Sequence, residues 1–130
     1  MLRQADYYGS DGRGALVCRL CAHECRIGAG RQGRCGVRIN RDGRLLTKTY
    51  GAVASMALDP VEKKPLYHFL PGSSTLSFCS PGCNFHCRFC QNASLSQSPD
   101  LKTFCSMTPD DIVKAAITEK AASISYTIIS

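Results

Sequence analysis

The stretch 82-GCNFHCRFCQN-92 holds three cysteines within eight residues, at positions 83, 87 and 90. Their spacing, C-x3-C-x2-C, gathers three thiols in one short loop that has no fourth cysteine. Clustered thiols are typical of metal sites in reducing compartments, where disulfides are rare. A cubane iron–sulfur cluster has four irons and normally takes four cysteines, so three ligands leave one iron open. Open positions are where metal centres do chemistry, and we interpret Cys83, Cys87 and Cys90 as ligands of a reactive cluster.

The composition of the whole chain sets the context for this loop. The chain has 130 residues, nine of them cysteine. One domain of this length buries roughly two-thirds of its unfolded surface, so the cysteines are not needed as staples. No stretch has the roughly 18 consecutive apolar residues of a membrane span, and the N-terminus lacks a signal peptide's basic start and apolar run. We therefore expect a cytoplasmic protein with reduced thiols and no membrane partner.

Positive charge is concentrated in the first part of the chain. Residues 1–50 contain ten Lys and Arg against four acidic residues, whereas residues 51–130 contain six of each. Such a basic segment indicates either a nucleic-acid footprint or arginines that offset the charge of thiolate ligands. No aromatic residues interleave with the arginines as they would on a stacking platform, so we favour the second interpretation and expect no nucleic-acid partner.

A second group of cysteines precedes the loop. Cys18, Cys21, Cys25 and Cys35 have the spacing C-x2-C-x3-C-x9-C. Four thiolates close a coordination sphere, so this site is expected to be structural or electron-transferring. The C-x2-C start suits zinc, the compact three-cysteine run suits an iron–sulfur cluster equally well, and His23 in place of one thiolate is a further alternative. Structural zinc can contribute about 10–16 kcal/mol in small peptides, enough to decide whether this lobe folds.

Three parts follow one another along the chain. Residues 1–50 are expected to form a cysteine-rich lobe, in which Asp42-Gly43 predicts a β-ribbon turn. Residues 51–73 contain three prolines and no sustained periodicity, which predicts an extended connector laid on a neighbouring surface. Residues 74–130 are expected to begin a larger core domain.

A capped helix is predicted in the last part. Thr108 is a suitable N-cap, Pro109 fits the first helical position, and Asp110 and Asp111 suit the positive end of the helix dipole. The residues that follow place one apolar stripe on the helix. Its members are Ile112, Val113, Ala116, Ile117 and Ala121.

Predicted strands lie on both sides of this helix, at residues 74–80 and 123–130. Strand, loop, helix and strand in this order predict one βαβ unit with parallel strands and a right-handed crossover. The fold class we expect is therefore α/β. A complete α/β barrel takes roughly 250 residues, so this unit would be the opening of a partial (β/α) barrel.

The cysteine loop resembles the cluster loop of radical S-adenosylmethionine (SAM) enzymes, with Phe89 just before the last cysteine, Gly82 ahead of the first, and Asn92 shortly after. The resemblance extends over nearly the whole chain. It runs through 18-CRLCAHECRIGAGRQGRCGVRINRDGRL-45, 59-DPVEKKPLYHFLPGS-73 and 82-GCNFHCRFCQN-92. This order of blocks is similar to the AmmeMemoRadiSam system radical SAM enzymes, relatives of the pyruvate formate-lyase activating enzymes.

The resemblance implies that Cys83, Cys87 and Cys90 bind a [4Fe–4S] cluster whose open iron is chelated by SAM. It marks Phe89, near the adenine, and Asn92 as cofactor-binding residues, and it assigns no catalytic side chain. The implied reaction is reductive cleavage of SAM to methionine and a 5′-deoxyadenosyl radical that abstracts hydrogen from a substrate. The electron would come from a donor such as reduced flavodoxin or ferredoxin, and the substrate is not specified.

One feature departs from the family pattern. In the family the second strand leads into a polar motif with a glutamate that helps to bind SAM. Here Tyr126-Thr127 is followed by Ile128-Ile129-Ser130. The resemblance therefore predicts the N-terminal portion of such an oxidoreductase.

Two other classes of function fit parts of the sequence. A cysteine-rich zinc module for nucleic acid would be colourless and would bind in a steeply salt-dependent way. A small two-cluster electron carrier would be brown, indifferent to SAM, and would need a fourth ligand, for which Cys79 is the candidate. In the radical SAM interpretation, Cys79 is a small buried residue and Cys105 a free thiol.

Overall fold

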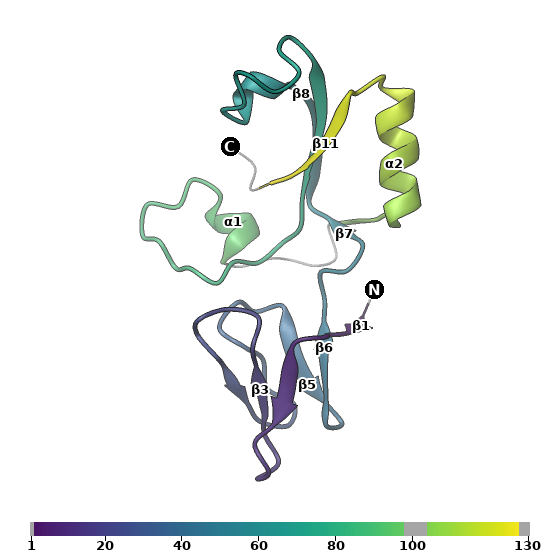
Figure 1. Cartoon of the computed structure of the whole chain (residues 1–130). Coiled ribbons are helices and arrows are strands. Elements are labelled where there is room, and N and C mark those ends of the chain that lie inside the picture. Colours follow the sequence, from purple (N-terminus) through teal and green to yellow (C-terminus); the bar gives the residue numbers. More distant parts are fainter. Residues whose placement is uncertain (1, 98–103, 128–130) are drawn as a thin grey trace. The chain divides into compact units, whose positions relative to one another are not determined.

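The computed structural model describes residues 2–97 and 104–127 (Figure 1). In this part of the chain, eleven short strands form four small sheets, accompanied by two α-helices and one 3-10 turn. The chain divides into two compact units. Unit 1 consists of Met1–Tyr50 and Pro81–Lys102, and unit 2 consists of Gly51–Ser80 and Thr103–Ser130. The cysteine-rich lobe and the three-cysteine loop thus share one unit. This division follows packing, whereas the boundaries predicted at residues 50 and 73 follow composition.

The predicted α/β fold class is wrong for the described residues. They form mainly small β-sheets, and the two helices, α1 (Ala93–Ser96) and α2 (Pro109–Thr118), have four and ten residues. Strand β9 (Ser74–Cys79) pairs in parallel with β11 (Ser123–Tyr126), as expected, but its other neighbour, β8 (Ser55–Pro60), is antiparallel. One parallel pair in a three-stranded mixed sheet is not a barrel unit, so the described residues do not contain the opening of a (β/α) barrel.

Unit 1 is built on two antiparallel three-stranded sheets, with strand orders β1-β6-β5 and β2-β3-β4. Leu16, Ile27 and Leu45 are buried in a shared core with Ala5 and Cys18. This core is small, so ordering of the unit depends on few apolar contacts. The strands are β1 (Arg3–Gln4), β2 (Tyr8–Ser10), β3 (Leu16–Cys18), β4 (Arg26–Ile27), β5 (Arg38–Arg41) and β6 (Arg44–Thr47).

The predicted turn at Asp42-Gly43 is confirmed. These two residues join β5 to β6 in an antiparallel hairpin, with φ values of 52° and 73°. Positive φ at both positions is what a type I′ turn requires, and it explains the choice of Asp-Gly. The hairpin also brings Asn40 into the core, where its side-chain amide donates to the carbonyl of Ile27 at 2.9 Å. That bond ties the two sheets together.

Unit 2 places α2 against the sheet of β11, β9 and β8 (Figure 1). Its core contains Val53, Leu76, Ile112 and Ala116. Residues 51–73, predicted to be an extended connector, contribute secondary structure to this unit. They hold β7 (Ala52–Val53), which pairs with β10 (Cys105–Ser106), then β8, and then the 3-10 turn η1 (Val61–Lys63).

The predicted start of α2 is confirmed. The Thr108 hydroxyl accepts the backbone N–H of Asp111 at 3.2 Å, and the Asp111 carboxylate accepts the backbone N–H of Thr108 at 2.9 Å. This reciprocal capping box satisfies two N–H groups at the helix end, and Pro109 occupies the first turn.

The predicted apolar stripe is only partly buried. Ile112 and Ala116 face the sheet, whereas Val113 is 47% exposed and Ile117 71% exposed. Successive helical residues are about 100° apart, so residues 113 and 117 lie on the shoulder of the buried face. The stripe inferred from periodicity is wider than the surface that the sheet covers.

Candidate functional site

The three-cysteine loop is closed at its base. The backbone N–H of Gly82 donates to the carbonyl of Leu95 at 2.9 Å. This bond joins the two ends of the loop of residues 82–95, which ends in α1. The side-chain amide of Gln97, directly after α1, donates to the carbonyl of Cys87 in the loop at 2.9 Å. Residues 85–89 are all exposed. The loop is therefore shaped by hydrogen bonds rather than by a core of its own.

The three predicted cluster ligands differ in their surroundings. Cys83 is half-buried, and its sulfur accepts the backbone N–H of Phe85 at 3.4 Å. The sulfur of Cys90 lies 3.3 Å from the hydroxyl of Ser96, while Cys87 is exposed. Hydrogen bonds to ligand sulfurs are one of the means by which a protein tunes the reduction potential of an iron–sulfur cluster.

The loop supplies thiols of the right kind and number for three corners of a cubane cluster. In residues 2–97 and 104–127, however, no three Cys, His or acidic side chains are gathered closely enough to form a ready metal site. Because residues 83–90 include no buried side chain, the loop can draw its sulfurs together at little packing cost. The donor set fits the cluster, and binding requires a local rearrangement.

The two predicted cofactor-binding residues, Phe89 and Asn92, belong to the second half of the loop along the chain. Phe89 is 91% exposed, so its ring is available to stack on another flat group. Asn92 is the residue just before α1, and its carbonyl accepts the backbone N–H groups of Leu95 and Ser96. In the sequence, both residues lie within two positions of Cys90.

The N-terminal quartet lies on one hairpin and one turn of unit 1. Cys18 is buried in β3, and its N–H donates to the carbonyl of Cys25 at 3.0 Å, with Cys21 in the turn between them. The sulfur of Cys25 lies 3.8 Å from the point where a Cβ on Gly33 would stand, and Cys35 follows in the same turn. All seven predicted ligand cysteines are free of disulfides.

Sequence reasoning missed the contacts between the lobe and the loop. Nε2 of His23 lies 2.8 Å from the carbonyl oxygen of Asn84, and Nε2 of His86 lies 3.2 Å from that of Arg34. Because a carbonyl oxygen only accepts, each ring nitrogen carries the hydrogen in these bonds. His23, considered above as a metal ligand, thus uses one nitrogen to hold the loop. These pairs are 61 and 52 residues apart in sequence, so no local pattern could reveal them.

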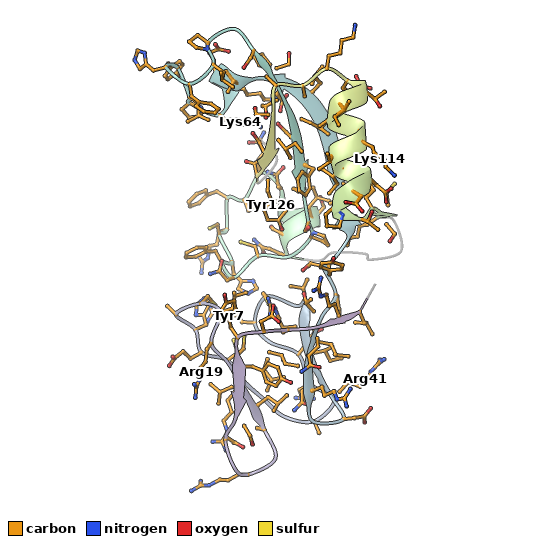
Figure 2. The ribbon with its side chains drawn as sticks, turned by 45° about the vertical axis from the view of Figure 1, so that its right-hand side comes forward. Tyr7, Arg19, Arg41, Lys64, Lys114 and Tyr126 are labelled. Atoms are coloured by element: carbon orange, nitrogen blue, oxygen red, sulfur yellow. The ribbon has the colours of Figure 1, made fainter. Side chains whose placement is uncertain are left out.

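Arginines of unit 1 have several different surroundings. Arg19 and Arg41 are exposed and project from the unit (Figure 2). Arg26 forms an ion pair with Asp11. The guanidinium of Arg3 lies over the ring of Tyr50, 4.2 Å from its centroid. The positive charge of this unit is thus partly engaged by its own residues.

Comparison with known proteins adds one informative similarity. Over 127 residues the chain is 42% identical to the uncharacterized protein MJ0808 of Methanocaldococcus jannaschii. The match covers 97% of this chain and 38% of that protein, so the chain spans less than two-fifths of the length of its relative. No family model and no solved structure matches the chain. The name of this relative gives no activity, so the similarity does not indicate a function for the chain.

No helix in residues 2–97 and 104–127 is long and apolar enough to cross a bilayer.

A second polar group lies in unit 2, around Asp59. Its carboxylate lies 3.0 Å from the ammonium groups of both Lys63 and Lys64, and it is almost fully buried (Figure 2 labels Lys64). The pKa of Asp59 is lowered to about 2. The nearby Ser77 hydroxyl has the largest effect, and Lys63 and Lys64 also lower this pKa, whereas burial raises it. Among the described residues the Ser77 hydroxyl makes no hydrogen bond, so the ion pairs with Lys63 and Lys64 are the stronger reason for the lowered pKa of Asp59.

We predict that Asp59 makes the stability of the chain pH-dependent at low pH. Because its folded pKa lies below the ordinary aspartate value of 3.8, its contribution to stability is fully present above pH 3.8 and is lost as pH falls towards 2. The shift corresponds to about 2 kcal/mol of unfolding free energy. Urea unfolding between pH 2 and pH 6 should show this loss in the wild type and not in Asp59→Asn. An equal acid dependence in both proteins would contradict the assignment.

Proposed function

We propose that this chain carries the cluster-binding part of a radical SAM oxidoreductase. The observation that supports this most strongly is the three-cysteine loop, which is short, exposed, closed at its base and without a fourth cysteine. Cys83, Cys87 and Cys90 would hold three irons of a [4Fe–4S] cluster, and SAM would take the fourth through its amino and carboxylate groups. The proposal needs no barrel in the described residues.

The surrounding residues support the same assignment. The Phe85 N–H and the Ser96 hydroxyl lie within reach of the sulfurs of Cys83 and Cys90, as expected for ligands whose charge must be stabilised. The exposed ring of Phe89 is available to the adenine of SAM, and Asn92 stands next to the loop. These side chains would orient the cofactor and shield it from water.

When bound, the cluster and SAM supply the chemistry. They would supply reductive cleavage of the sulfonium C–S bond and a radical able to abstract hydrogen from a substrate, while Cys83, Cys87 and Cys90 would hold the cluster. A reduced flavodoxin or ferredoxin would provide the electron in the cytoplasm, where the thiols stay reduced. The proposal extends to a metal at Cys18, Cys21, Cys25 and Cys35, either zinc or a second iron–sulfur cluster.

Electron paramagnetic resonance tests this function. The full chain, reconstituted anaerobically with iron and sulfide and reduced with dithionite, should give a cluster signal whose g-values change when SAM is added. The change is expected because SAM alters the coordination of one iron. A cluster signal that ignores SAM would favour the electron carrier. A colourless protein that holds zinc and binds nucleic acid in a salt-dependent way would favour the zinc module.

A further inference from the structure

We infer that a metal bound at the N-terminal quartet orders the surrounding lobe, and that the ordered lobe holds the three-cysteine loop in place. His23 is the principal residue that positions the loop. The inference rests on the proposed function only in taking the loop as the cluster site. It concerns a coupling between two groups of cysteines that the sequence treats as independent. Both groups lie in the same compact unit, so their contacts can be compared directly.

The lobe contacts the loop at three points. His23 donates to the carbonyl of Asn84, which directly follows Cys83. His86 of the loop donates back to the carbonyl of Arg34. Gly82 approaches the lobe so closely that a Cβ there would stand 2.5 Å from Val37 and 3.0 Å from the carbonyl oxygen of Cys35. The entrance and the first half of the loop are thus held from outside.

Each lobe group in these contacts lies within two residues of a cysteine of the quartet. His23 lies between Cys21 and Cys25, and Arg34 directly precedes Cys35, whose own carbonyl faces Gly82. A metal that joins these cysteines would fix the backbone that aims the imidazole and the two carbonyls. Without that metal, the turn after Cys21 is held by a backbone hydrogen bond from Glu24, which has a positive φ of 40°.

The loop has little else to give it a fixed shape. Residues 85–89 are exposed, and α1 has no buried residue. Segments with few buried contacts open locally at low free-energy cost, so their order depends on the groups that anchor them. Metal binding stabilises the state that binds it, and here that state includes the anchors of the loop. Occupancy of the quartet should therefore order the loop.

The test uses zinc alone and a variant whose loop cannot bind it. In Cys83→Ser/Cys87→Ser/Cys90→Ser, the quartet is the one predicted metal site that remains, and Cys79 and Cys105 are the other cysteines. One equivalent of zinc should slow hydrogen exchange at the backbone amides of residues 83–90 by about tenfold or more, because the anchored loop opens less often. Adding Cys21→Ser/Cys35→Ser to this variant should remove the effect.

His23 variants separate positioning from general folding. In the loop-serine background, His23→Ala should abolish most of the zinc-dependent slowing, and His23→Gln, which keeps a side-chain N–H donor, should restore much of it. His68→Ala is the matched control, because His68 is exposed and belongs to unit 2. His68→Ala should leave the slowing unchanged.

Either of two results would overturn the inference: zinc bound at the quartet with no slowing of exchange in the loop, or no zinc bound at the quartet. The experiment uses neither iron nor SAM, so its failure is distinct from failure of the proposed function. If zinc slows hydrogen exchange in the loop but the cluster signal does not respond to SAM, the inference about the lobe stands and the radical SAM proposal fails.

Discussion

Replacing Cys83, Cys87 and Cys90 together with alanine is expected to remove the SAM-sensitive resonance signal completely. These thiols are the proposed protein ligands of the cluster, and without them its irons have no protein anchor. They lie at exposed or half-buried positions of a loop without a core, so their loss should leave the rest of the unit folded. Resonance spectra and iron content, measured with and without SAM, provide the readout.

Two single variants act as controls for this result. Cys105→Ala removes an exposed thiol from unit 2 and should leave the signal unchanged. Cys79→Ser distinguishes the radical SAM proposal from the electron carrier. The variant should leave the cluster signal nearly unchanged under the proposal, whereas it should destroy one cluster of the carrier, which requires Cys79 as a fourth ligand. Cys79 is 5% exposed in β9, which agrees with its expected role as a small buried residue. A SAM-sensitive signal that survives in the triple variant would show that the cluster is bound elsewhere.

Gly82→Ala is expected to have the second large effect. Gly82 has a φ of 89°, and an added Cβ would meet Val37 at 2.5 Å and the Cys35 carbonyl oxygen at 3.0 Å. Such strain costs roughly 1–3 kcal/mol and must be relieved by moving the loop away from the lobe. We expect iron retained by the loop to fall by about tenfold or more, which corresponds to about 1.4 kcal/mol.

A matched glycine distinguishes the clash from the backbone strain. Gly12 also lies in unit 1, with a φ of 72°, but nothing stands within 4 Å of an added Cβ. Gly12→Ala should therefore leave iron binding almost unchanged. Gly82→Ala combined with Val37→Ala should recover part of the lost iron. If Gly82→Ala alone retained iron as the wild type does, the close approach of loop and lobe would not matter for the site.

Local signals in the sequence were reliable guides to this fold. The hairpin at Asp42-Gly43 and the capped start of α2 at Thr108 were both predicted, because each depends on residues within four positions of one another. The same holds for the strand at β9. Where one short segment determines its own conformation, composition and spacing are sufficient.

Features that depend on distant partners were predicted poorly. For residues 51–73 the composition predicted an extended connector laid on a neighbouring surface, but it did not show that β8 in that segment pairs along the whole of β9. The α/β fold class was inferred from the order of elements, which does not show that an antiparallel strand joins the sheet. Val113 and Ile117 follow the helical period but lie beside the covered face. Pairing and coverage are set by tertiary contacts that a local pattern does not contain.

The candidate site likewise combines features that local sequence shows with contacts that it does not show. The candidate cysteines were chosen from spacing alone, because ligands in one loop are neighbours in sequence, and their role as ligands stays a prediction. The anchoring bonds of His23 and His86 were not found, because each joins residues more than fifty positions apart. The ion pairs of Lys63 and Lys64 with Asp59 were not predicted either, and only the i, i+4 spacing of Asp59 and Lys63 hinted at one of them.

The most direct test of the central claim is electron–nuclear double resonance of the reduced, reconstituted protein with isotopically labelled SAM. SAM labelled with nitrogen-15 in its amino group and oxygen-17 in its carboxylate should show hyperfine coupling from both nuclei to the cluster. That result would place both groups on the iron that Cys83, Cys87 and Cys90 leave open. A well-formed cluster with no coupling to either label, at saturating SAM, would contradict the account.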